Sequence, residues 1–117
     1  ILCDDFGFDG KMANNRFNAM TKAFCNGRKF LISSMVLIQR YSMTTPNIRH
    51  NASGLVIFNT NLKELELIVS ENNYLSSKQE LLTLFRENLK STYDFIIINY
   101  SNDAKDIYLN KDFESII

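Results

Sequence analysis

Four short predicted strands, separated by segments with helical spacing, constrain the fold of this chain more than any other feature. They lie at residues 1–5, 35–38, 55–58 and 93–100. Unbroken apolar runs of this length are typical of strands that are covered on both faces. Helices between such strands imply a mainly parallel sheet flanked by helices. The sequence therefore predicts an α/β fold.

The segments before the third strand alternate between helical and loop patterns. Apolar residues at three- and four-residue spacing predict an amphipathic helix over residues 11–25. Residues 40–47 are polar and contain the only proline, which predicts a loop. The only histidine, His50, has no cysteine or carboxylate at ligand spacing, so we expect neither a histidine metal site nor histidine-based catalysis.

Two helices are predicted between the third and fourth strands. Residues 59–61 can cap a segment whose apolar stripe covers residues 62–69. A capping pair, Ser77 and Glu80, begins a second amphipathic helix that ends near residue 90. After the fourth strand, a turn leads into a short extended tail.

Composition narrows the classes of partner. The 13 basic and 13 acidic residues cancel, so the chain has no global attraction for nucleic acid or membrane. DNA binding would have to come from a local patch or from a ring of subunits. No apolar stretch is long enough to span a bilayer, and we expect no membrane partner. The two cysteines, Cys3 and Cys25, favour a reducing, intracellular compartment over a disulfide framework.

The length suggests one core. With 117 residues, 45% of them apolar, we expect one domain or a piece of one. The chain begins inside a predicted strand, and too little sequence follows to supply both neighbours of a central parallel strand. We therefore expect a fragment of a longer protein, with apolar surface left exposed.

Polar side chains end the first two strands. Asp4 and Asp5 end the first, and Gln39 is the first polar residue after the second. If the strands are parallel neighbours, these residues meet at the carboxyl edge of the sheet, where open α/β folds bind their ligands. Paired carboxylates can hold hydrated Mg²⁺ and orient an attacking water. A solvated junction for the acids, and a turn hydrogen bond for Gln39, fit the same residues.

The chain resembles the C-terminal part of viral genome-packaging ATPases of the FtsK/HerA type. The likeness is carried mainly by the first half of the chain, and the second half is similar mainly in layout. The piece 48–58 also looks like the corresponding stretch of the bacterial DNA translocase FtsK. The matching segments are Ile1 to Asp5, Gly27 and Arg28, Leu37 to Gln39, Pro46, Ile48 and Arg49, Asn51, and the strand that ends at Phe58.

The resemblance implies a role for each candidate residue. Asp4 would bind the Mg²⁺ of ATP through water, and Asp5 would polarise the attacking water. Gln39 would contact the γ-phosphate or that water. Arg28 would be an arginine finger that reaches a neighbouring subunit's nucleotide, although a solvated arginine at a helix C-terminus fits it too. Arg49, which we expect in the loop after Gln39, would serve the same role or contact DNA.

The resemblance also implies partners and a place. The motor would act on double-stranded DNA as a homo-oligomeric ring at a capsid portal or vertex. It would work in the host-cell cytoplasm or virus factory, or in association with the virion. Residues 1–117 would form the C-terminal part of one RecA-like P-loop domain of the ASCE type, beginning at the Walker B strand.

The chain departs from the pattern in one important respect. It contains no Gly-x-x-x-x-Gly-Lys-Ser/Thr stretch, the Walker A loop whose amides and lysine cradle phosphates. We therefore expect this chain alone neither to bind ATP tightly nor to hydrolyse it. The second acid of the family is often Glu, and Asp5 reaches less far.

Other classes remain open. Another P-loop translocase or helicase is one alternative, although a helicase needs more arginine and nucleic-acid motifs than Arg49 provides. A receiver-type domain would need a phosphoacceptor aspartate at the end of the second strand, where Gln39 stands. A non-catalytic interaction domain is a third alternative, and it would tolerate asparagine in place of Asp4 and Asp5.

Overall fold

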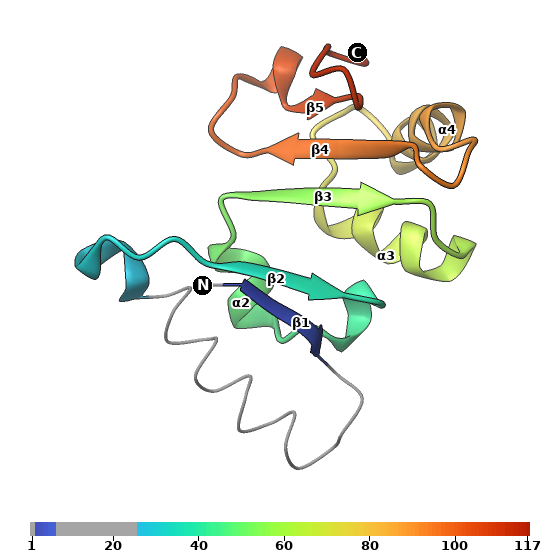
Figure 1. Cartoon of the computed structure of the whole chain (residues 1–117). Coiled ribbons are helices and arrows are strands. Elements are labelled where there is room, and N and C mark those ends of the chain that lie inside the picture. The colour runs from blue at the N-terminus through green and yellow to red at the C-terminus, as the bar shows by residue number, and fades with distance from the viewer. Residues whose placement is uncertain (1, 7–25) are drawn as a thin grey trace. The chain divides into compact units, whose positions relative to one another are not determined.

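The computed structural model describes residues 2–6 and 26–117 of the chain (Figure 1). The predicted helix over residues 11–25 lies outside the described residues. The chain divides into two compact units, an N-terminal unit, Ile1–Ala52, and a C-terminal unit, Ser53–Ile117. Within the described residues, no helix has the length and apolar character needed to cross a membrane.

Two parallel strands form the sheet of the N-terminal unit. Strand β1, Leu2–Phe6, pairs with β2, Met35–Ile38 (Figure 1). This pairing confirms that the first two predicted strands are parallel neighbours. Strand β2 is not covered on both faces as its sequence predicts, because Met35 and Leu37 are 61% and 45% exposed. Apolar surface therefore remains open on this strand.

Short helical segments flank β2. The 3-10 helix η1, Gly27–Phe30, precedes it, and the next residue, Leu31, has a left-handed backbone with a φ of 56°. After β2 come the 3-10 helix η2, Tyr41–Met43, and helix α2, Pro46–Asn51. The predicted loop over residues 40–47 is therefore wrong in part. Pro46 starts a helix because its fixed φ suits the first helical turn, where its missing N–H is not needed.

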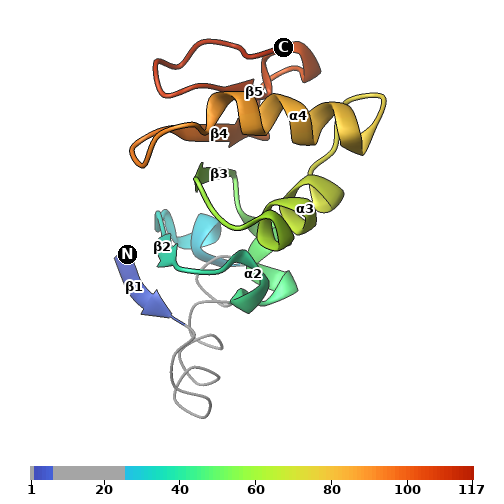
Figure 2. The same ribbon diagram turned by 90° about the vertical axis from the view of Figure 1, so that its right-hand side faces the viewer.

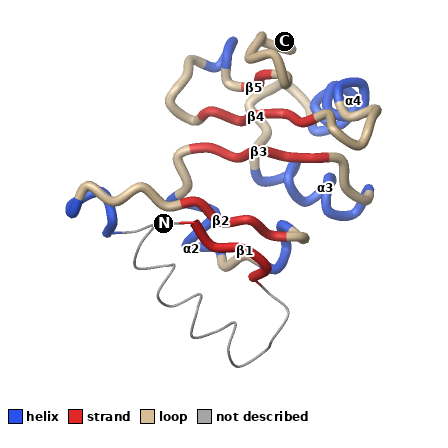
Figure 3. Tube along the Cα trace, viewed as in Figure 1, coloured by secondary structure: helices blue, strands red, loops and turns tan. Residues whose placement is uncertain are grey.

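The C-terminal unit contains three antiparallel strands. Its sheet has the order β3-β4-β5, and both pairings are antiparallel (Figures 1 and 3). The elements in chain order are β3 Gly54–Phe58, α3 Leu62–Glu71, α4 Lys78–Asn88, β4 Phe95–Asn99, the 3-10 helix η3 Ala104–Asp106, and β5 Tyr108–Leu109.

The antiparallel sheet overturns the prediction of a mainly parallel one for this part of the chain. One helix between two strands returns the chain to its starting end, so the next strand runs parallel to the first. Here two helices, α3 and α4, lie between β3 and β4. Together with their connecting loops they return the chain to the end of the sheet at which β3 finishes, so β4 runs antiparallel to β3.

Both helices of this unit begin at the predicted caps. The Asn61 side chain accepts a hydrogen bond from the Glu64 amide at 2.9 Å, and the Ser77 hydroxyl accepts one from the Glu80 amide at 3.1 Å. Figure 2 shows α3 and α4 on the same side of the sheet. These local signals are therefore confirmed.

The core of the C-terminal unit lies between this helix pair and one sheet face. Paired residues of the strands share that face, and the Phe85 ring of α4 packs edge-on against Tyr108 with 5.5 Å between centroids. On the other face Val56 and Phe58 are more than half exposed. The buried apolar residues of this unit are Ile57, Leu65, Ile68, Val69, Leu81, Leu82, Phe85, Leu89, Ile96, Ile98, Ile107 and Tyr108.

Candidate functional site

The two predicted acids lie where the pairing of β1 with β2 is irregular. Cys3 pairs with Val36 and Phe6 pairs with Ile38, so β1 advances three residues while β2 advances two. The extra residue falls in the Asp4-Asp5 segment. Bulges of this kind are over-represented next to active sites, because they change the direction of the strand locally.

Gln39 lies at the same sheet edge as the acids. It directly follows Ile38, which is paired with Phe6, the residue after Asp5. Gln39 is exposed. The first strand does not end at the acids as predicted, because β1 continues to Phe6. The backbone positions of the two acids and of Gln39 nevertheless all lie toward the carboxyl ends of the parallel pair.

Asp4 and Asp5 are residue types that bind Mg²⁺ in proteins. Mg²⁺ prefers oxygen ligands and usually takes one or two carboxylates, with waters and phosphate oxygens completing its shell. Asp4 and Asp5 supply that number of carboxylates. Among the described residues no group of three or more His, Cys, Asp or Glu side chains could form an all-protein metal site. The residue types at positions 4 and 5 are therefore ones that Mg²⁺ can bind.

Arg28 is not brought to this edge. It lies in η1, which ends four residues before β2 begins, whereas Gln39 follows the end of β2. A four-residue strand spans roughly 13 Å. Arg28 therefore sits at the amino end of β2, opposite the acids.

Arg49 lies in the last turn of α2, not in a loop as the sequence predicts. Its guanidinium carbon is 5.0 Å from the centroid of the Tyr41 ring. Tyr41 begins η2, two residues after Gln39. His50, the next residue of α2, is exposed. Sequence reasoning missed this contact, because the irregular segment between Tyr41 and Arg49 has no fixed periodicity.

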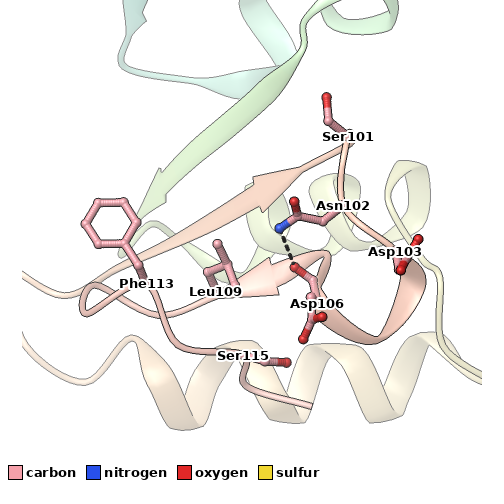
Figure 4. A pocket seen from close by; sticks show the side chains of 7 residues that line it. All are labelled: Ser101, Asn102, Asp103, Asp106, Leu109, Phe113 and Ser115. Carbon is pink, nitrogen blue, oxygen red and sulfur yellow. Dashed lines mark hydrogen bonds between the residues drawn. The ribbon is translucent and has the colours of Figure 1, made fainter.

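A hollow of about 480 Å³ lies on the C-terminal unit (Figure 4). The Asn102 side-chain amide donates to the Asp106 carbonyl at 2.9 Å across one side of it. Its lining includes two carboxylates and no basic side chain, so it repels a polyanionic nucleotide. The lining residues are Ser101, Asn102, Asp103, Asp106, Leu109, Phe113 and Ser115.

A hydrogen-bonded cluster around Tyr108 in the C-terminal unit has a structural role. The buried Tyr108 hydroxyl donates to the Asn72 carbonyl and accepts from the Tyr74 amide at 2.9 Å. The Tyr100 hydroxyl donates to Asn72 Oδ1. Burial raises the pKa of Tyr108, so its hydroxyl stays protonated and serves to tie the Asn72 turn to β5. No local pattern in the sequence predicts this network, because its partners are up to 36 residues apart.

The comparison with known families gives one match. The sequence profile of the family described as Poxvirus A32 protein matches residues 1–115. No curated protein and no solved structure matches the chain. Because the match covers nearly the whole chain, the chain belongs to the poxvirus A32 protein family of viral genome-packaging ATPases.

Proposed function

We propose that the natural protein is an ATP-driven motor that moves viral double-stranded DNA into a capsid. In this proposal the N-terminal unit carries one edge of the ATP site. The observation that supports it most is the parallel pairing of β1 with β2, which gives Asp4, Asp5 and Gln39 a common sheet edge. Family membership supplies the class of activity, and this edge supplies the residues.

Each residue of the edge has a role suited to its chemistry. Asp4 would hold Mg²⁺ through water, and the ion would neutralise charge on the phosphates of ATP. Asp5 would accept a hydrogen bond from the attacking water and orient it. The Gln39 amide can both donate and accept, so it suits contact with the γ-phosphate and with that water.

The phosphate-binding loop would come from another part of the natural protein. The chain holds no Gly-x-x-x-x-Gly-Lys-Ser/Thr stretch, and hydrolysis needs backbone amides and a lysine around the phosphates. We assign the chain to the C-terminal part of a P-loop domain of the FtsK/HerA type, beginning at its Walker B strand. The exposed Met35 and Leu37 of β2 support this assignment, because further elements would cover them.

A ring of identical subunits would complete the site. Arg28 lies at the end of β2 opposite the acids, so we assign it to a neighbouring subunit's nucleotide as an arginine finger. The number of subunits is left open. The ring would grip double-stranded DNA at a capsid portal or vertex, in the host-cell cytoplasm or virus factory.

The test is the Asp5→Asn variant of the natural protein. Asparagine keeps the size of the side chain, but it lacks the carboxylate that orients the attacking water and accepts its proton. We expect DNA-stimulated ATP hydrolysis to fall by roughly 10²- to 10⁴-fold, the usual worth of a positioned base. Phosphate release in the presence and absence of double-stranded DNA measures this.

The matched control is Asp103→Asn, which changes an exposed acid of the C-terminal unit. It should hydrolyse ATP at the unchanged rate. If Asp5→Asn kept full activity while remaining folded, the edge of β1 would not be catalytic. This chain would then be a non-catalytic part of the ATPase.

A further inference from the structure

The contact between Tyr41 and Arg49 joins two parts of the N-terminal unit that the sequence does not relate. Tyr41 lies just beyond the end of β2, and Arg49 lies in the last turn of α2. The guanidinium carbon stands 5.0 Å above the ring centroid, and both side chains are partly buried. This is within the range of an attractive cation–π contact.

The backbone between these residues is closely bonded. The Met43 and Thr44 amides donate to the Arg40 and Tyr41 carbonyls, each at 3.1 Å. The Arg49 amide donates to the Thr45 carbonyl at 3.2 Å. Consecutive turns therefore connect Arg40, the residue after Gln39, to Arg49, and they limit how far the two segments can move apart.

Stacking on a ring suits an arginine that binds an oxyanion. A stacked guanidinium keeps its N–H donors in the plane of the group, and these donors match two phosphate oxygens at once. A simple interaction with the helix dipole needs only a positive charge near the last turn, in any orientation. Arg86 offers that simpler case, because it lies in the last turn of α4 and is exposed.

We propose that Tyr41 is a positioning residue that holds Arg49 in place to bind a phosphate group. This inference rests on the proposed function and adds the residue that couples the Gln39 segment to that phosphate. The phosphate belongs either to a neighbouring subunit's ATP or to the DNA backbone. Both sources present the same oxyanion, and separate measurements distinguish them.

The experiment uses the natural protein with ATP and a mixed-sequence DNA duplex as probes. Tyr41→Leu removes the ring, and Tyr41→Phe keeps it. We expect Tyr41→Leu to lower activity roughly ten- to a hundredfold, as misplacing a binding group does. Tyr41→Phe should stay within about twofold of the unchanged protein, because the ring face remains.

The measured quantity identifies the source of the phosphate. If the phosphate belongs to ATP, Tyr41→Leu lowers kcat while the KM for ATP changes little. If it belongs to DNA, Tyr41→Leu raises the Kd of the duplex and weakens the salt dependence of binding by about one phosphate contact. Arg49→Lys should reproduce the loss in either case, since a lysine keeps the charge but not the planar donors. Arg86→Ala should change neither quantity.

A double variant tests whether Tyr41 acts through Arg49. In an Arg49→Ala background, Tyr41→Leu should cause no additional loss. The inference is overturned if Tyr41→Leu is silent, if its effect persists undiminished in that background, or if Arg49→Lys retains full kcat and DNA affinity. If Tyr41→Leu fails to fold, Arg49→Lys alone decides in the same way.

Asp5→Asn separates this inference from the proposed function. If Asp5→Asn is inactive while the Tyr41 and Arg49 variants are normal, only the inference fails. If the unchanged natural protein does not hydrolyse ATP, the proposed function fails, and if Asp5→Asn is fully active, the catalytic role of Asp5 fails. In either case loss of duplex binding in Arg49→Lys still supports phosphate binding, and unchanged binding refutes it.

Discussion

The N-terminal and C-terminal units differ in where their apolar side chains lie. Among the described residues, every buried apolar side chain except Ile48 belongs to the C-terminal unit. In the N-terminal unit, Phe30, Leu31, Met35 and Leu37 are all more than two-fifths exposed. The C-terminal unit therefore has a core and capped helices of its own, whereas the described N-terminal unit has open apolar surface.

The residues with candidate chemistry show the opposite distribution. Asp4, Asp5, Arg28, Gln39 and Arg49 all belong to the N-terminal unit. The hollow and the tyrosine network of the C-terminal unit offer no comparable set. Changes in the C-terminal unit should therefore alter the free energy of unfolding, and changes at the N-terminal strand ends should alter activity.

The largest expected effect on stability comes from Phe85→Ala. Phe85 is fully buried and packs edge-on against Tyr108. Removing a buried phenylalanine ring leaves a cavity and typically costs about 3–5 kcal/mol. Urea unfolding of the 117-residue chain, followed by far-UV circular dichroism, measures the loss.

Leu37→Ala is the matched variant in the N-terminal unit. Because Leu37 is 45% exposed, its truncation should cost less than about 1 kcal/mol. Equal losses from Phe85→Ala and Leu37→Ala would contradict the conclusion that only the C-terminal unit has a packed core.

Gly54→Ala tests how closely two strands of the C-terminal unit approach. A Cβ atom on Gly54 would stand 2.9 Å from the Ile98 carbonyl oxygen, which is backbone and cannot rotate away. Forcing the strands apart should cost about 1–3 kcal/mol. The same urea titration measures it. Ser53→Ala, a change at the exposed neighbour, should stay within about 0.5 kcal/mol.

The features that sequence predicted correctly are local. Asn61 and Ser77 cap helices through bonds to residues three positions away, and such bonds follow from a short segment alone. The parallel pairing of β1 with β2 was predictable because both segments are short apolar runs with enough chain between them for a crossover. The continuation of β1 past the acids to Phe6 was not predicted. The roles of Asp4, Asp5 and Gln39 stay predictions.

The features that the sequence analysis missed are the direction of a strand and contacts between residues far apart in the chain. The antiparallel β3–β4 pairing depends on the end of the sheet to which the α3–α4 segment returns the chain, and periodicity within that segment does not specify this end. The stacking of Arg49 on Tyr41, and the bond of Tyr108 to Asn72, join residues with no shared periodicity. Only the folded backbone brings such pairs together.

Ser77→Ala gives a smaller effect. The Ser77 hydroxyl accepts a hydrogen bond from the Glu80 amide. This amide is one of the N–H groups in the first turn of a helix that have no backbone partner within the helix. Its removal should lower the free energy of unfolding by about 1 kcal/mol. Thermal unfolding measures the shift. Ser76→Ala changes the exposed residue next to the cap and should shift the transition much less, so equal shifts would contradict the capping role.

The smallest effect is a pH dependence at the end of the C-terminal unit. Lys111 Nζ lies 2.8 Å from Asp94 Oδ1, and the Ser91 amide donates to Asp94 Oδ2 at 2.9 Å. The hydrogen bond from Lys111, followed by that from Ser91, lowers the pKa of Asp94 well below its ordinary value. The contact also raises the pKa of Lys111.

The sign of the effect follows from the lowered pKa of Asp94. A carboxylate with a lowered pKa stabilises the fold above the ordinary aspartate pKa of about 3.9, and this stabilisation is lost as the pH falls below it. Asp94→Asn should therefore unfold slightly more easily than the unchanged chain at pH 7. The difference should shrink progressively below about pH 4, because the unchanged chain then loses the same contact. Urea titrations at pH 7 and at acidic pH measure it. A difference that grew with acidification would mean that Asp94 is held in its neutral form, and the ion pair with Lys111 would then contribute nothing at neutral pH.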